Sequence, residues 1–304
     1  MTAGTTPGKA RAMRIEWPTL ALIALCYGAW CMGTTWLAAA ALWLAIPITG
    51  LAVALFSSLQ HEVIHGHPFR ARWLNEALVF PALTLAVPFV RFRDSHLDHH
   101  VNADLTDPYD DPESNYLDPE VWAGLPIWVQ RVLLFNNTLA GRMLIGALIS
   151  QIAFMLGDLR RAGFGDRRII GGWLWHIPAL VPVFAWLIWV GSMPLWGYIL
   201  AAYIGLSLIK VRTFLEHQAH ERASGRTAIV EARGLFGLLF LNNNLHVVHH
   251  AHPAVPWYRL PKLYRARKER FHAQNGGYVY ASYTEVFRRH LFRRKDPVPH
   301  PRLR

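Results

Sequence analysis

Histidine is concentrated in a few short stretches of this chain. Ten of the sixteen histidines fall into three clusters and one looser pair. In chain order they are His61 and His65; His96, His99 and His100; His217 and His220; and His246, His249 and His250. Imidazole titrates near neutrality and is a common ligand of transition metals, so this concentration favours a metal centre over packing. One ion needs three or four imidazoles, and nine or ten therefore predict two ions.

The spacing inside each cluster is that of a helix. His61 and His65 are four residues apart, and the two triplets have the spacing i, i+3, i+4. Residues three or four apart share a helix face, so one helical turn can direct two or three rings at one point. His217 follows an apolar segment that ends at Ile209, within reach of a helix extending from it. Four segments can then converge on one polyhistidine site.

Ligation by nitrogen alone leaves Zn, Fe, Cu and Ni as candidate metals. Two sites of four or five imidazoles fit non-haem iron, whereas a closed zinc site would usually recruit cysteine. The only cysteines, Cys26 and Cys31, lie in the first apolar segment. A ligating histidine normally donates its second N–H to a carboxylate or a carbonyl. The carboxylates considered for that role are Glu62, Asp94, Asp98, Asp104, Asp107 and Glu216; Asp107, Asp110 and Asp111 are equally well read as ordinary loop charges.

Two other metal sites fit parts of the pattern. Residues 61–65 read His-Glu-Val-Ile-His, which matches the H-E-x-x-H motif of zinc proteases, with the glutamate as general base. That site needs one further ligand and leaves most of the clustered histidines unexplained. A haem held by two histidines needs axial ligands inside the membrane, and His176 is the only histidine in an expected span.

The elements that must position these histidines are long apolar segments. The chain is 53% hydrophobic with thirteen tryptophans, which is typical of a membrane protein. Two runs without Asp, Glu, Lys or Arg, 17–61 and 171–209, are each about twice the roughly 20 residues needed to cross a bilayer. We expect two helical hairpins, the first turning near Gly33-Thr34-Thr35. The expected spans are about 19–36, 37–59, 172–190 and 195–212, with shorter re-entrant or interfacial pieces at about 77–90 and 144–156.

The predicted fold class is an all-α integral membrane protein with about four spans and a cytosolic helical cap. A single domain over 1–304 is expected, with the cap formed by 60–142 and 213–304. Basic residues such as Lys9, Arg11 and Arg14 flank the hairpins, and the hairpin tips carry no charge. The positive-inside rule then places both termini and the histidines in the cytoplasm. A bacterial inner membrane is the expected location.

The net charge of +11 is concentrated near the C-terminus. From Arg259 onward there are thirteen Lys and Arg against three acidic residues. For a chain anchored in a bilayer, such a tail favours anionic lipid headgroups, and an acidic electron carrier is a further candidate partner. A nucleic-acid partner is not expected, although a basic tail alone would permit one.

The order H-x3-H, H-x2-H-H and, after a second hairpin, H-x2-H-H resembles the membrane fatty-acid desaturase superfamily over roughly residues 20–290. The resemblance implies a di-iron, O2-dependent oxidoreductase that attacks an unactivated C–H bond. It implies a metal ligand set of His61, His65, His96, His99, His100, His217, His246, His249 and His250. His217 ends the segment Thr213–His217, which resembles the one that supplies an additional ligand in many members, and His220 is its substitute.

Acyl-lipid desaturation is the expected reaction, since it is the commonest in this superfamily. Hydroxylation or ketolation of a lipid, a carotenoid or a small amphiphile is the alternative, because 105–112 and 252–257 resemble segments of carotenoid-modifying members. The chain contains no fused cytochrome b5 or ferredoxin domain, so the resemblance implies a separate electron carrier of one of these types. We also expect a narrow apolar substrate pocket, lined by 77–90 and by the hairpins.

Overall fold

Four long apolar helices form the membrane part of the molecule. The computed structural model describes residues 15–101 and 104–303. Each of the four helices is long and apolar enough to cross a membrane. They are α1 (Trp17–Met32), continued through a π-helical turn (Gly33–Leu37) and α2 (Ala38–Ala40); α3 (Leu42–Ile64); α10 (Arg167–Trp189); and α11 (Leu195–Thr213). The predicted all-α class with four spans is confirmed. Lys9, Arg11 and Arg14 lie outside the described residues.

The first hairpin turns later than the sequence suggests. The helix continues through Gly33-Thr34-Thr35, and the chain reverses at Ala41, whose φ of −155° leaves the helical region. The Thr34 hydroxyl donates to the carbonyl of Trp30 at 2.8 Å, and the Thr35 hydroxyl donates to that of Cys31 at 2.7 Å. Hydroxyls that bond back to the preceding turn are compatible with a helix, so a sequence typical of turns in water remains helical here.

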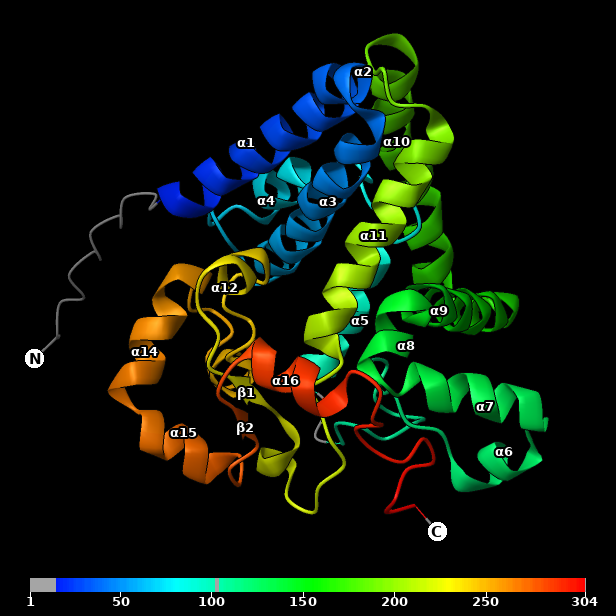
Figure 1. The fold of residues 1–304 in the computed structure, drawn as a ribbon, viewed down its shortest axis with the longest axis vertical. Coiled ribbons are helices and arrows are strands. Elements are labelled where there is room, and N and C mark those ends of the chain that lie inside the picture. Colours follow the sequence, from blue (N-terminus) through cyan, green and yellow to red (C-terminus); the bar gives the residue numbers. More distant parts are fainter. Residues whose placement is uncertain (1–14, 102–103, 304) are drawn as a thin grey trace, which may run out of the picture.

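The two hairpins meet through a close contact between α3 and α11. A Cβ added to Gly205 on α11 would lie 2.8 Å from the carbonyl oxygen of Gly50 on α3. Small residues let the backbones of two membrane helices approach in this way. Both helices end on the same side of the bundle (Figure 1). This contact therefore fixes the relative position of the two helix ends that carry His61 and His217.

An irregular segment, 79–88, lies among the spans between α4 (Arg72–Leu78) and α5 (Phe89–Val101). The amide of Ala82 donates to the carbonyl of Ala179 at 2.9 Å, and His176 Nε2 donates to the carbonyl of Leu85 at 2.7 Å. Non-helical backbone at membrane depth is tolerated where it is buried in protein. The segment fits the expected re-entrant piece. Its hydrogen bond uses Nε2 of His176, the one histidine in an expected span that could have been an axial haem ligand.

Helix α9 (Gly146–Gly163) lies beside the lower half of α11 and extends away from it below α10 (Figure 1). Its exposed apolar side chains include Leu148, Ile152 and Leu159, and the basic residues Arg160 and Arg161 are in its last turn. This distribution fits an interfacial helix, as expected for 144–156. A buried ion pair attaches it to α5, because Asp158 accepts from Arg91 Nε at 2.8 Å and from Arg91 Nη2 at 2.9 Å.

The remaining elements cover the end of the bundle where α3 and α11 finish (Figure 1). They are α6 (Pro119–Gly124), α7 (Ile127–Asn136), α8 (Leu139–Leu144), a 3₁₀ turn (Ala223–Arg226), β1 (Ile229–Val230), α12 (Leu235–Leu239), α13 (His246–Ala251), a 3₁₀ turn (Trp257–Arg259), α14 (Leu260–Ala266), α15 (Lys268–Gln274), β2 (Val279–Tyr280) and α16 (Tyr283–His290). In the described part of the chain, β1 and β2 are the only strands, and they pair in parallel with Ile229 opposite Val279.

Candidate metal centre

Nine clustered histidines meet at the end of the spans. They come from four segments: the last turn of α3 and the residue after it, the second half of α5, the chain just beyond α11, and the short helix α13. His61, His96, His99, His246 and His249 are buried, and the other four are partly exposed. Three segments are helical at the histidines, as the spacing predicts.

The nine rings form two groups, and within each group one ligand atom per ring lies within 4.8 Å of the others. The first group contains His61, His65, His96, His100 and His249. The second group contains His99, His217, His246 and His250. In the second group, His217 Nε2 lies 3.0 Å from His99 Nε2 and 3.1 Å from His246 Nε2. In the first, the Nε2 atoms of His65 and His96 are 3.1 Å apart, as are those of His100 and His249.

These distances fit ligands arranged around an ion. Two nitrogens at right angles on a metal, each about 2.1 Å from it, are about 3.0 Å apart. Each neutral imidazole carries a single N–H, so a set of converging Nε2 atoms cannot all be satisfied by hydrogen bonds with one another. A metal ion accepts all of the lone pairs at once. Both groups therefore fit the binding of a metal, with Nε2 as the converging atom in eight of the nine rings. The Nε2 atom of the ninth, His61, lies 3.4 Å from Asn243 Nδ2.

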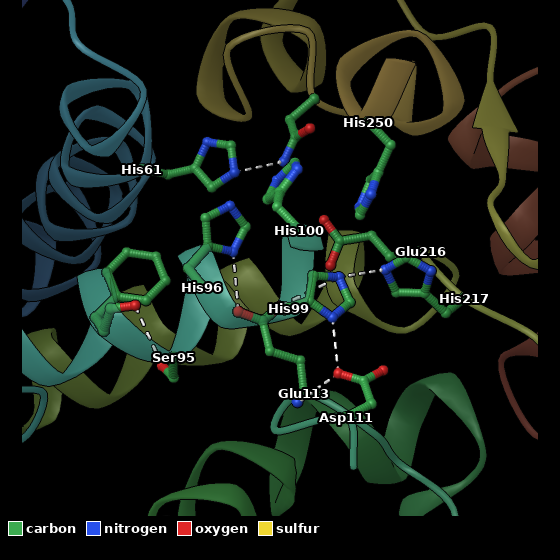
Figure 2. Close-up of polar contacts among 12 residues, drawn as sticks. His61, Ser95, His96, His99, His100, Asp111, Glu113, Glu216, His217 and His250 are labelled. Atoms are coloured by element: carbon green, nitrogen blue, oxygen red, sulfur yellow. Dashed lines mark hydrogen bonds and ion pairs between the residues drawn. The ribbon is translucent and has the colours of Figure 1, made fainter. Parts of the chain in front are cut away.

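Polar side chains hold the opposite nitrogen of several rings. His99 Nδ1 donates to Asp111 Oδ1 at 2.7 Å, and His96 Nδ1 donates to Glu113 Oε1 at 2.9 Å (Figure 2). His246 Nδ1 lies 3.1 Å from Asn243 Oδ1. A partner at Nδ1 fixes the tautomer and leaves the Nε2 lone pair free for a metal.

Comparison with protein families agrees with this geometry. The family model "Fatty acid desaturase" matches residues 34–282, which include all nine clustered histidines. The chain belongs to the fatty acid desaturase family. It is therefore an integral membrane oxidoreductase of the desaturase and hydroxylase type, which indicates a lipid substrate. The comparison with curated proteins gave no match.

The charge environment of this desaturase differs between rings. Burial lowers the pKa of His100 and His217 to about 3, so both rings are neutral near pH 7. Burial acts in the same direction on His99, but the nearby Glu113 carboxylate and the hydrogen bond to Asp111 outweigh it and raise the pKa of His99 to about 9. The carboxylates beside His99 therefore favour a positive charge at this place, whether it is a proton or a metal ion.

Only some of the carboxylates that the sequence suggested as hydrogen-bond partners of the ligand histidines lie next to them. Glu216 Oε1 lies 3.6 Å from His246 Nδ1, whereas Asp94 pairs with Arg93 and Asp107 accepts from the amides of its own loop. Asp111, which could equally have been a loop charge, contacts His99. Glu113 and Asn243 were not expected. No spacing rule identifies them, because they reach the rings through the tertiary fold.

The glutamate of the H-E-x-x-H motif does not face the histidine groups. Glu62 Oε1 accepts from the amide of Trp257 at 3.0 Å and lies 3.9 Å from His67 Nε2. A zinc protease would need this carboxylate beside the metal-bound water. His220 also lies apart from the two groups, with its Nδ1 accepting from the amide of Arg222 at 3.1 Å. His217, rather than its substitute, joins the cluster.

A cavity of about 650 Å³ adjoins the histidines. His61, His96, His217 and His246 form part of its wall, and residues of α5, α8, α9 and α11 form much of the rest. The expected lining is found only in part: the hairpin helices α3 and α11 contribute to the wall, whereas Val87 is the one residue of 77–90 in it. Irregular backbone of 79–88 packs against the spans instead, and charged side chains of α8 and α11 reach the cavity.

Proposed function

We propose that this desaturase is a di-iron enzyme that uses O2 and two electrons to attack an unactivated C–H bond. The observation that carries the proposal is the division of nine converging imidazoles into groups of five and four. The proposed iron ligands are His61, His65, His96, His99, His100, His217, His246, His249 and His250. Bound iron would supply the oxidising chemistry with O2, which no side chain can supply.

The donor set supports non-haem iron. Imidazole binds iron well, and neither cysteine is available, because Cys26 and Cys31 are both in α1. Asp111 and Glu113 are negatively charged groups that orient rings and balance part of the charge of two cations. The residues of the chain thus have three tasks: to hold each ion through Nε2, to fix ring orientation through Nδ1, and to place the substrate in the adjoining cavity.

Desaturation of a fatty-acyl or lipid substrate is the reaction that family membership favours. Hydroxylation or ketolation of a lipid, a carotenoid or a small amphiphile is the second candidate. The cavity gives specific support to an amphiphile, because its wall combines apolar side chains such as Phe154 and Leu206 with the charged Arg142 and Lys210. Desaturation and each hydroxylation step require the same two electrons and the same iron ligands, and ketolation requires two such hydroxylations at one carbon.

The electrons are proposed to come from a separate ferredoxin or cytochrome b5 type protein. Exposed basic side chains on α14 and α15, among them Lys262, Arg265 and Arg270, would attract an acidic carrier, and these helices follow the ligand helix α13. Placement of the metal centre and both termini on the cytoplasmic side of a bacterial inner membrane is part of the proposal. The positive-inside rule supports it.

Expression in a bacterial host, followed by mass spectrometry of extracted lipids, tests the proposed activity. The expected result is a product that has lost two hydrogens or gained one oxygen, formed only with O2 and a reductant. A His246→Ala variant is the matched control, because it removes one proposed ligand from the second group. Identical lipid profiles for the wild type and this variant, with both proteins present in the membrane, would contradict the proposal.

A further inference from the structure

Two cations in the cavity wall have no carboxylate partner among the residues that the structure describes. They are Arg142 on α8 and Lys210 on α11. Arg142 is only 5% exposed. Its Nε donates to the carbonyl of Asn136 at 3.2 Å, and its Nη1 donates to Asn115 Oδ1. These partners are neutral, so they satisfy hydrogen bonds without balancing the charge.

The other arginines of the cavity wall contact carboxylates directly. Arg91 forms its two bonds to Asp158, and Arg212 Nη1 lies 3.3 Å from Glu216 Oε1. Lys210 is partly exposed, and it forms no hydrogen bond or ion pair within the described part of the chain. Glu216 and Glu113 attract it without contacting it. In the described part of the chain, Arg142 and Lys210 are therefore the cations of the wall that have no carboxylate bonded to them.

A buried cation without a bonded counter-charge is unfavourable, and this applies to Arg142. Arg142 and Lys210 also repel each other, and both line the cavity beside the proposed metal centre. An anion bound in the cavity would lower the free energy of both cations. The wall also has apolar side chains, among them Ile149, Phe154 and Leu206, so the same space also accepts a hydrocarbon chain. A volume of about 650 Å³ lies within the usual range for small-molecule sites.

We propose that Arg142 and Lys210 bind the anionic group, a carboxylate or a phosphate, of an amphiphilic substrate. The inference rests on the proposed function, since it concerns the substrate of that same centre. His217 and His246 line the same cavity, and His217 also shares a small pocket with Arg142, so we expect the C–H bond that reacts to be near the anionic group rather than far along an apolar chain. Arg142 and Lys210 thus determine both the class of substrate and the region of the molecule that is attacked.

Binding of matched amphiphiles to the full chain in a non-ionic detergent tests this inference. The probes are dodecanoate, dodecyl phosphate and dodecanol, which share a chain length and differ in charge, together with inorganic phosphate. Titration calorimetry without O2 or reductant gives affinities independent of turnover. We expect at least one anionic probe to bind about tenfold or more tightly than dodecanol, a difference of about 1.4 kcal/mol. The better anion identifies the headgroup as carboxylate or phosphate.

Three variants assign the preference to these side chains. Lys210→Met and the double variant R142Q/K210M should reduce the tenfold preference, the double variant to near unity. Arg160→Gln removes an exposed cation of α9 outside the cavity wall and should leave the preference unchanged. Lys210→Met keeps the test valid if loss of the packed Arg142 prevents folding, which the thermal unfolding midpoint reports.

Equal affinity for charged and neutral probes would overturn the inference, as would an equal loss in Arg160→Gln. Inorganic phosphate that competes as well as dodecyl phosphate would also overturn it, because the site would then bind a free anion. Iron content and product formation are measured on the same preparations. Failure of the proposed function appears there, whereas an active di-iron enzyme without anion preference contradicts only this inference.

Discussion

The two histidine groups lie side by side but differ in ligand number and in charge. The first has five imidazoles, drawn from the end of α3 and from α5 and α13. The second has four, one of which, His217, lies in irregular chain beyond α11. Asp111 and Glu216 approach rings of the second group, and Glu113 is bonded to His96 of the first group but also lies 4.0 Å from His99 of the second. If each ion had six ligands, the second group would leave more coordination positions free for other ligands than the first group would.

We infer from this difference that the two groups would hold their ions differently. A five-nitrogen set built mainly on helices is suited to tight retention of an ion. A four-nitrogen set with carboxylates beside it has fewer ligands to lose, and it relies more on the groups behind the rings. The following variants and conditions either separate the two groups or show that they act as one site.

The largest effect is expected from removing two ligands of one group. The double variant H99A/H246A leaves two ligands in the second group, and H65A/H249A leaves three in the first. Since a stable site needs three or more ligands, H99A/H246A should lose about one of two bound irons and retain the other. Metal analysis of the purified proteins measures this. Complete loss of iron from H99A/H246A would show that the groups are not independent.

Single substitutions should separate the groups less sharply. His217→Ala leaves three ligands in the second group, whereas His65→Ala leaves four in the first. For His217→Ala we expect the iron affinity of the second group to fall by more than about 100-fold, which exceeds the usual effect of losing a residue that only hydrogen-bonds to a ligand. For His65→Ala we expect a smaller fall in the iron affinity of the first group. Competition with a chelator provides the affinities. The opposite order would mean that ligand number does not determine retention.

Loss of the groups behind the rings should have a smaller effect. Asp111→Asn removes the charge beside His99 and should weaken iron binding to the second group by about 10–100-fold. Asp107→Asn is the matched control, because Asp107 accepts only from amides of its own loop among the bonds observed. An equal loss of iron affinity in the two variants would mean that Asp111 does not contribute specifically to iron binding.

The smallest effect is a difference in pH dependence. The pKa of His99 is raised to about 9, so this ring must lose a proton before Nε2 and Nδ1 can serve a metal and Asp111 together. Below pH 9, iron affinity of the second group should therefore rise about tenfold per pH unit. The first group should change little near neutrality, because burial lowers the pKa of His100 to about 3. Chelator competition across neutral pH measures both, and identical slopes would contradict the assignment.

Much of the centre follows from spacing alone. Helical periodicity in the three clusters predicts convergence of rings, and the structure brings His61, His96 and His249 together from elements far apart in sequence. The spans of the second hairpin were also close to those observed, since charge and proline mark the ends of α10 and α11. These features depend on local pattern, which a sequence displays directly.

Other features depend on contacts that no local pattern contains. The turn of the first hairpin was misplaced, because Thr34 and Thr35 bond within the helix instead of leaving it. Glu113 and Asn243 reach ligand histidines only after the loop beyond α5 and the chain before α13 have folded over the spans. The positive charge of Arg142 in the cavity wall also depends on the tertiary fold, because α8 places this residue there.

Metal content of the purified full chain is the most direct test of the proposed di-iron centre. Plasma emission would count the metals, and Mössbauer spectroscopy after expression with enriched iron would describe their environment. We expect about two irons per chain in two distinct high-spin, nitrogen-rich sites. One zinc and no iron would contradict it, and would favour the zinc site of the H-E-x-x-H motif instead.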